Sequence, residues 1–207
     1  MRLPLSQAFA EAVATREGCP ADTIWGFIDG SFRKVCRPST FQCLLYNGHY
    51  KAHGFKVQAV VAPNGLTACL HGPYPGHRHA STILGDSGLL QALRDAGAVH
   101  HLYGDPAYPL SDMLITGFKG VNLTARQRHC NARMSSVRES VEWGFGGVLQ
   151  QWAWVDFEKN QKVYLQEVGM NYIAATLLSN MMICFRGNVA FKFFGLEPPS
   201  ADEYLRM

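Results

Sequence analysis

The chain has 207 residues, of which 47% are apolar and 17% are charged, and its formal net charge is +3. This length suits one domain that can bury a core of its own. The composition excludes an intrinsically disordered chain, which would carry fewer apolar residues and more charge. So small a net charge neither requires nor excludes a nucleic-acid partner, so the positions of the charges must decide.

Six cysteines are spread along the chain without a CxxC pair or the spacing of a zinc ribbon. The first 20 residues lack the apolar core of a signal peptide. We therefore expect reduced thiols in an intracellular protein.

The first half of the chain predicts one helix followed by strands. Apolar residues recur at helical spacing over residues 1–20, and Pro20 ends the run. We then expect three buried strands: from Thr23 to an end at Asp29-Gly30, over residues 55–62, and over residues 66–71 after a turn at 63–65. The last two strands form a predicted hairpin.

The second half mixes one strand with several helices. We expect a helix over 81–96, a strand over 99–103 that ends at Gly104-Asp105, a short helix over 107–115, a loop over 116–122, and one or two helices over 124–149. This order predicts an α/β fold with a mixed sheet and helices around it. We divide the chain into an N-terminal helical segment (1–22), a core with a C-terminal helix (23–187) and a C-terminal tail (188–207).

The most apolar long segment runs over residues 162–186, and its part 168–185 is long enough to raise the question of a membrane span. It contains Asn171, Ser179 and Asn180, which are costly in lipid, and it lacks a basic or aromatic flanking pattern. We expect a core helix without membrane contact, and this helix is also a candidate for a homodimer interface.

Three acids stand out by position: Asp29 and Asp105 follow predicted strands, and Glu142 lies in a predicted helix. Carboxylate oxygens are the ligands that Mg²⁺ and Mn²⁺ prefer, and two such ions can drive phosphoryl transfer. The spacing of these acids is weak support, because the chain has 16 acids and strand-end aspartates often form turns.

Five sequence words in order strengthen the interpretation: Trp-Gly-Phe-Ile-Asp-Gly-Ser at 25–31, Tyr-Asn-Gly-His-Tyr-Lys-Ala-His-Gly-Phe-Lys-Val-Gln at 46–58, Pro-Gly-His-Arg-His-Ala-Ser at 75–81, Leu-Tyr-Gly-Asp-Pro-Ala-Tyr-Pro-Leu at 102–110, and Arg-Glu-Ser-Val-Glu-Trp-Gly-Phe-Gly at 138–146. Asn131 precedes the last word. Together they resemble the DDE superfamily endonuclease domain of PIF/Harbinger-type transposases and their domesticated relatives. The resemblance covers about residues 25–154.

The resemblance implies an RNase H-like fold, with a mixed five-stranded sheet flanked by helices. It also implies that Asp29, Asp105 and Glu142 are the catalytic acids and hold two Mg²⁺ or Mn²⁺ ions. Glu139 lies nearby but lacks the Phe-Gly context of Glu142. The implied activity is hydrolysis or transfer of DNA phosphodiesters, in the nucleus if the source is eukaryotic.

Two departures keep a second hypothesis open. The family usually has His-Asp where this chain has His79-Ala80, and a helix-turn-helix region usually precedes the nuclease, whereas 28 residues precede Asp29 here. We expect either a fragment of a transposase or dependence on a separate DNA-targeting protein. The alternative function is a catalytically inactive, domesticated DNA- or protein-binding domain.

Basic residues form two acid-free runs near the proposed catalytic acids, which favours phosphate contact. The candidates for DNA binding are Arg33, Lys34, Lys51, Lys56, Arg126, Arg128, Arg133 and Arg138. For Tyr46, Tyr50 and Tyr108 we favour core or structural packing over stacking on bases. A third hypothesis is a zinc hydrolase built on His77, His79, His100, His101, His129 and Cys130, although no pair has helical i, i+4 spacing.

Overall fold

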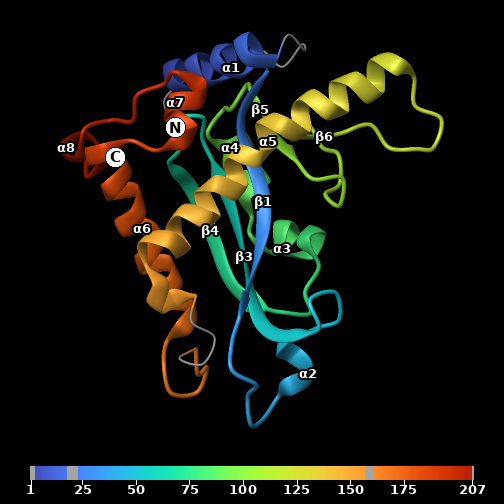
Figure 1. Ribbon diagram of the computed structural model, residues 1–207. Coiled ribbons are helices and arrows are strands. Elements are labelled where there is room, and N and C mark those ends of the chain that lie inside the picture. Colours follow the sequence, from blue (N-terminus) through green and yellow to red (C-terminus); the bar gives the residue numbers. More distant parts are fainter. Residues whose placement is uncertain (1–2, 18–22, 157–160, 207) are drawn as a thin grey trace.

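The computed structural model describes residues 3–17, 23–156 and 161–206 (Figure 1). Its strands are β1 (Ile24–Lys34), β2 (Tyr46–Asn47), β3 (Ala52–Val61), β4 (Thr67–Pro75), β5 (His101–Gly104) and β6 (Leu114–Thr116). Its helices are α1 (Leu3–Glu17), α2 (Gln42–Leu45), α3 (Ala80–Asp86), α4 (Leu89–Asp95), α5 (Ala125–Gln151), α6 (Val168–Arg186), α7 (Val189–Phe194) and α8 (Ala201–Tyr204), with a 3₁₀ turn at Ala153–Val155.

The strands form one mixed sheet. Its five longer strands lie in the order β4-β3-β1-β5-β6, and the two-residue β2 pairs with the start of β3. The pairs on the β3 side of β1 are antiparallel, whereas β1/β5 and β5/β6 are parallel. The predicted α/β class and the mixed sheet flanked by helices are confirmed, and the arrangement is consistent with an RNase H-like fold.

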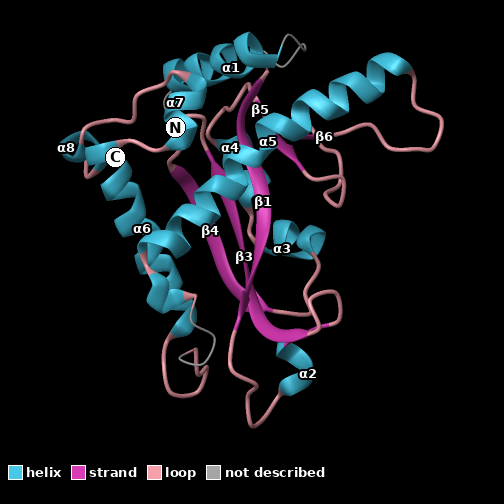
Figure 2. Cartoon of the chain, viewed as in Figure 1, coloured by secondary structure: helices cyan, strands magenta, loops and turns pink. Residues whose placement is uncertain are grey.

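Both faces of the sheet are covered by helices, because β1 is apolar on both faces. Phe27 points to the face covered by α5, where it packs with Val137. Ile28 points to the other face and packs with Leu84 and Leu89 of α3 and α4. Burying each side chain of this size contributes about 1.5–3 kcal/mol. Figure 2 shows α5 crossing the strands obliquely, so the long helix and the central strand are held against each other.

The first predicted strand ends in the wrong place. Instead of stopping at Asp29, β1 continues to Lys34, and its pairing with β3 runs from Phe27↔Val61 to Lys34↔Gly54. Asp-Gly looked like a turn, but β3 supplies hydrogen-bonding partners beyond it. Only the parallel pairing with β5 stops before Asp29, at Ile28↔Gly104.

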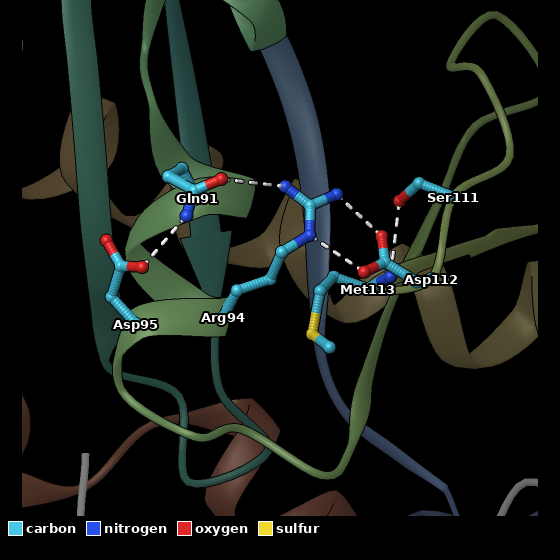
Figure 3. Close-up of polar contacts among 6 residues, drawn as sticks. All are labelled: Gln91, Arg94, Asp95, Ser111, Asp112 and Met113. Carbon is cyan, nitrogen blue, oxygen red and sulfur yellow. Dashed lines mark hydrogen bonds and ion pairs between the residues drawn. The ribbon is translucent and has the colours of Figure 1, made fainter.

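The short helix expected over residues 107–115 is wrong. This segment is a loop followed by β6, because Pro106 and Pro109 disfavour helical backbone. Figure 3 shows what holds the loop: Arg94 of α4 donates two hydrogen bonds to the Asp112 carboxylate, at 2.7 and 2.6 Å. The ion pair therefore ties the loop that follows Asp105 to α4.

Three other elements differ in detail from the prediction. The helix expected over 81–96 is two helices, separated at Gly88, whose φ of 64° is left-handed and favours glycine. The segment 124–149 forms one helix, α5, and the 188–207 tail contains α7 and α8. The proposed helix stop at Pro20 lies outside the described residues.

The apolar helix α6 packs against β4, with Tyr172, Ala175 and Asn180 buried. By length and composition it is also the one helix in the described part of the chain that would be able to cross a membrane. The Asn180 side chain bonds to the backbone of Thr67, which favours a core helix. The expected lack of membrane contact stays a prediction.

Candidate active site

Asp29 and Asp105 lie beside each other because their strands are parallel neighbours. Ile28 pairs with Gly104, so each aspartate is the next residue after a matched pair. Each carboxylate is also oriented locally: Asp29 accepts the Gly30 backbone N–H at 2.7 Å, and Asp105 accepts the Ala107 N–H at 2.6 Å. The two acids that were predicted to follow strands are therefore neighbours in the structure.

Glu142 lies on α5, and Arg138, one helical turn earlier on the same helix, lies between Glu142 and Asp29. The Arg138 guanidinium donates to Asp29 Oδ2 at 2.7 Å and lies 3.9 Å from Glu142 Oε1. Glu142 is 60% exposed, whereas the Asp29 side chain is 20% exposed. Arg138 therefore places a positive charge between two of the three proposed catalytic acids.

The ionisation of Asp29 reflects this crowding. Burial raises the pKa of its carboxyl, the Gly30 N–H and the Arg138 guanidinium lower it, and the negative charges of Asp105 and Glu142 raise it; the net shift is upward. Asp105 and Glu142 thus both lie within electrostatic reach of Asp29, and Glu139 is not among the charges that act on it. This favours Glu142 over Glu139 as the third acid.

A cleft of about 220 Å³ opens beside the two aspartates. Tyr108 and Gln58 lie in its lining, and the Gln58 side-chain amide donates to the Tyr108 hydroxyl at 3.0 Å. Burial raises the pKa of Tyr108, so this hydroxyl keeps its proton at neutral pH. Ala80 also lines the cleft and offers no polar group there.

Sequence reasoning missed Gln58, and a signal was present. Gln58 is the one polar residue in the run from Val57 to Ala62, yet its exposure is only 1%. It pairs across the sheet with Gly30, next to Asp29. A buried polar side chain in a central strand needs a polar partner, and this one lies at the cleft.

The three tyrosines, for which core or structural packing was expected, differ in burial: Tyr108 packs in the core, whereas Tyr46 and Tyr50 pack against His53 and Phe32. Tyr108 is 1% exposed, but Tyr46 and Tyr50 are 43% and 48% exposed. Tyr46 lies in the two-residue β2 and Tyr50 in the turn that follows it, before the buried part of β3 begins, so these two rings reach the surface.

Comparison with protein families decides the assignment. A family model described as DDE superfamily endonuclease matches residues 28–180, which is more than half of the chain. The chain belongs to the DDE superfamily endonucleases. Searches of curated proteins and of solved structures return no match. The match contains Asp29, Asp105 and Glu142, and the family supports a nuclease or transposase-like activity with DNA as the substrate.

The eight basic residues proposed to bind DNA differ in exposure, three being partly buried and five exposed. Arg33, Lys56 and Arg138 are engaged by the protein: Arg33 bonds to Ser31 Oγ at 2.7 Å, Lys56 donates to the Arg78 carbonyl, and Arg138 pairs with Asp29. The exposed group lies in two places: Lys34 and Lys51 by β1 and β3, and Arg126, Arg128 and Arg133 on α5. The structure therefore does not gather the predicted DNA-binding residues into one patch.

The donor chemistry of the site suits the divalent ions that the family generally uses. Asp29, Asp105 and Glu142 offer carboxylate oxygens, and the guanidinium of Arg138 already occupies a position between Asp29 and Glu142. In the described part of the chain, however, no three His, Cys, Asp or Glu side chains are close enough together to hold an ion. Asp29 would have to release Arg138 to bind a metal through Oδ2.

The same finding removes the support for a zinc centre among the described residues. The buried His100 contacts Ser6 and Gln7 of α1 through its two ring nitrogens, and these contacts link α1 to the start of β5. His77 contacts the Leu44 carbonyl at 2.7 Å. These histidines serve local contacts in separate parts of the fold.

Proposed function

We propose that this domain cleaves DNA phosphodiesters with two Mg²⁺ or Mn²⁺ ions, as a PIF/Harbinger-type transposase or a nuclease derived from one. The observation that carries the proposal is the placement of Asp29 and Asp105 directly after the last matched pair of two parallel strands, with Glu142 within electrostatic reach. If the source is eukaryotic, the site of action would be the nucleus.

In this proposal the acids hold the ions, and Asp105 is the acid best prepared to do so. Its Oδ1 is fixed by the Ala107 N–H, and it has no cationic partner among the described residues that would have to leave. Bound ions would activate a water molecule or a DNA 3′-hydroxyl and stabilise the departing oxygen. Arg138 would move from Asp29 toward the phosphate or remain on Glu142.

The first experiment is nicking of supercoiled plasmid in Mg²⁺ or Mn²⁺. We expect Asp105→Ala to lower the rate by more than about 100-fold, because changes to residues that only orient metal ligands already cost about 10–100-fold. Glu139→Gln is the matched control, since Glu139 lies on the same helix as Glu142 but does not act on Asp29. Equal nicking by the wild type and Asp105→Ala would contradict the proposal.

A catalytically inactive DNA-binding domain is the second candidate. It is favoured by Ala80, which leaves the cleft without a further carboxylate, and by the close pairing of Arg138 with Asp29. Calorimetric titration with Mn²⁺ separates the two candidates. Binding that is lost in Asp29→Asn and Asp105→Ala supports the nuclease, and DNA binding without any Mn²⁺ binding supports the inactive domain.

A further inference from the structure

The cleft beside the catalytic acids has a wall that the proposed cleavage reaction does not use. Its lining runs from Asp29 and Asp105 to Phe32, His49 and Tyr50, which belong to β1 and to the turn before β3. The cleft is smaller than the 300–1,000 Å³ typical of pockets for drug-sized ligands. It suits a single planar group better than a larger ligand.

Tyr50 forms an aromatic platform in this wall. Its ring lies parallel to that of Phe32, with centroids 4.6 Å apart and 2° between the planes. His49 meets the Tyr50 ring edge-on at 4.9 Å. Phe32 is buried, whereas Tyr50 is 48% exposed. One face of Tyr50 is therefore supported by the protein, and the ring still offers apolar surface to a ligand.

The turn that carries the platform is held rigidly by Asn47. This side chain accepts the backbone N–H groups of His49 and Tyr50 at 3.0 and 3.2 Å, and it donates to the Gly76 carbonyl at 2.6 Å. Asn47 is only 7% exposed. The position of Tyr50 is thus fixed before any ligand arrives, which lowers the entropic cost of binding.

The lining of the cleft also contains an unsatisfied acceptor. Gln58 is 1% exposed, and its Oε1 is buried without a hydrogen-bond partner among the described residues. Most buried polar atoms are paired, so an unpaired one at a cleft favours a ligand or water that donates to it. Lys56 lies in the same lining and adds positive charge near the platform.

We propose that this cleft binds one unpaired nucleotide of the DNA substrate, with its base stacked on Tyr50 and its phosphate toward Asp29 and Asp105. The inference rests on the proposed nuclease function and adds the form of DNA that the site takes. Stacking accepts any base because every base has a π-face, so the site would select an unpaired nucleotide without selecting a sequence.

The test compares two probes by fluorescence anisotropy in EDTA, so that no cleavage occurs. Both are the same short duplex with a three-nucleotide 3′ tail, made of thymidines in one and of abasic sites in the other, so that their phosphates are equal. We expect the wild type to bind the thymidine tail about 10-fold more tightly. Tyr50→Ala should abolish this ratio, and Tyr50→Phe, which keeps the ring, should retain it.

Phe185→Ala is the matched control, because Phe185 is an aromatic residue of α6 that is 70% exposed and does not line the cleft. It should leave the ratio unchanged. Equal binding of the two tails by the wild type, or an unchanged ratio in Tyr50→Ala, overturns the inference. Metal-dependent nicking in the same preparation would then leave the proposed function standing, whereas loss of both nicking and DNA binding would remove the two together.

Discussion

The Asp29 carboxylate combines burial with two acidic neighbours, and this makes its ionisation costly to the fold. Because its pKa is raised, the folded state holds the proton more firmly than the unfolded chain does. The stability that this protonation contributes is fully present below the unfolded pKa, near pH 4, and is lost as pH rises through the folded-state pKa. The site therefore destabilises the metal-free protein at neutral pH.

We expect Asp29→Asn to be more stable than the wild type at pH 7 in EDTA. A gain of about 1 kcal/mol would raise Tm by about 2–4 °C in a chain of this size, and it should disappear below about pH 4. Thermal unfolding followed by circular dichroism over this pH range measures the effect. The amide can still accept a hydrogen bond from Arg138, so that contact is not lost outright.

Asp112→Asn provides the opposite control. Hydrogen bonds from Arg94 lower the pKa of Asp112, so its ionised form supports the fold above the unfolded pKa. Its replacement should give no gain at pH 7. If Asp29→Asn and Asp112→Asn shift Tm in the same direction, the conclusion that ionised Asp29 destabilises the metal-free fold is wrong.

At the scale of elements, α5 joins the two halves of the proposed activity. It begins with a capping box, in which Thr124 and Gln127 exchange side-chain and backbone hydrogen bonds. Its first turns are largely exposed and carry Arg126 and Arg128, and its buried positions begin at Met134. Glu142 follows further along the same helix. The continuous helix α5 would therefore position DNA bound to its first turns relative to Glu142.

We expect the double variant Arg126→Gln/Arg128→Gln to weaken binding to all duplex sequences alike. If each arginine contacts one phosphate, the slope of log K against log salt should become shallower by about 2. Anisotropy titrations at several salt concentrations measure this slope. Lys162→Gln/Arg206→Gln, which removes two exposed charges elsewhere, should leave it unchanged. A slope that is the same in both double variants would exclude this part of α5 from the DNA contact.

At the scale of the whole molecule, a feature was predictable where the signal for it lies within one short segment of sequence, as for most strands and for the motifs around the three acids. The apolar runs predicted β1, β3, β4 and β5 but neither β2 nor β6, and the Asp29, Asp105 and Glu142 words matched one family. The end of β1 was not predictable, because β3 extends it through long-range pairing. Arg138 was assigned to DNA from its charge, and its contact with Asp29 depends on how α5 crosses the sheet. Tyr50 became a surface residue through a turn fixed by Asn47.

Helices α6 and α8 are attached to the sheet at β4, an edge strand, and Asn180 is the polar link between them. Its side chain accepts the Thr67 N–H at 3.0 Å and donates to the Thr67 carbonyl at 2.9 Å and to the Tyr204 hydroxyl at 3.0 Å. One side-chain amide thus pairs with the backbone N–H and C=O of an edge strand, as a neighbouring strand would, and it joins β4, α6 and α8. Because Asn180 is 2% exposed, water cannot readily replace it.

We expect Asn180→Ala to lower the free energy of unfolding by about 2–4 kcal/mol, because it leaves two backbone groups of Thr67 and a tyrosine hydroxyl without their partner. Urea unfolding measures the change. Asn171→Ala, on the same helix but less buried, should cost less than about 0.5 kcal/mol. If the two variants are equally stable, the link is dispensable and apolar packing of α6 on β4 is sufficient. A loss confined to Asn180→Ala means that this polar link stabilises the attachment of α6 and α8 to β4.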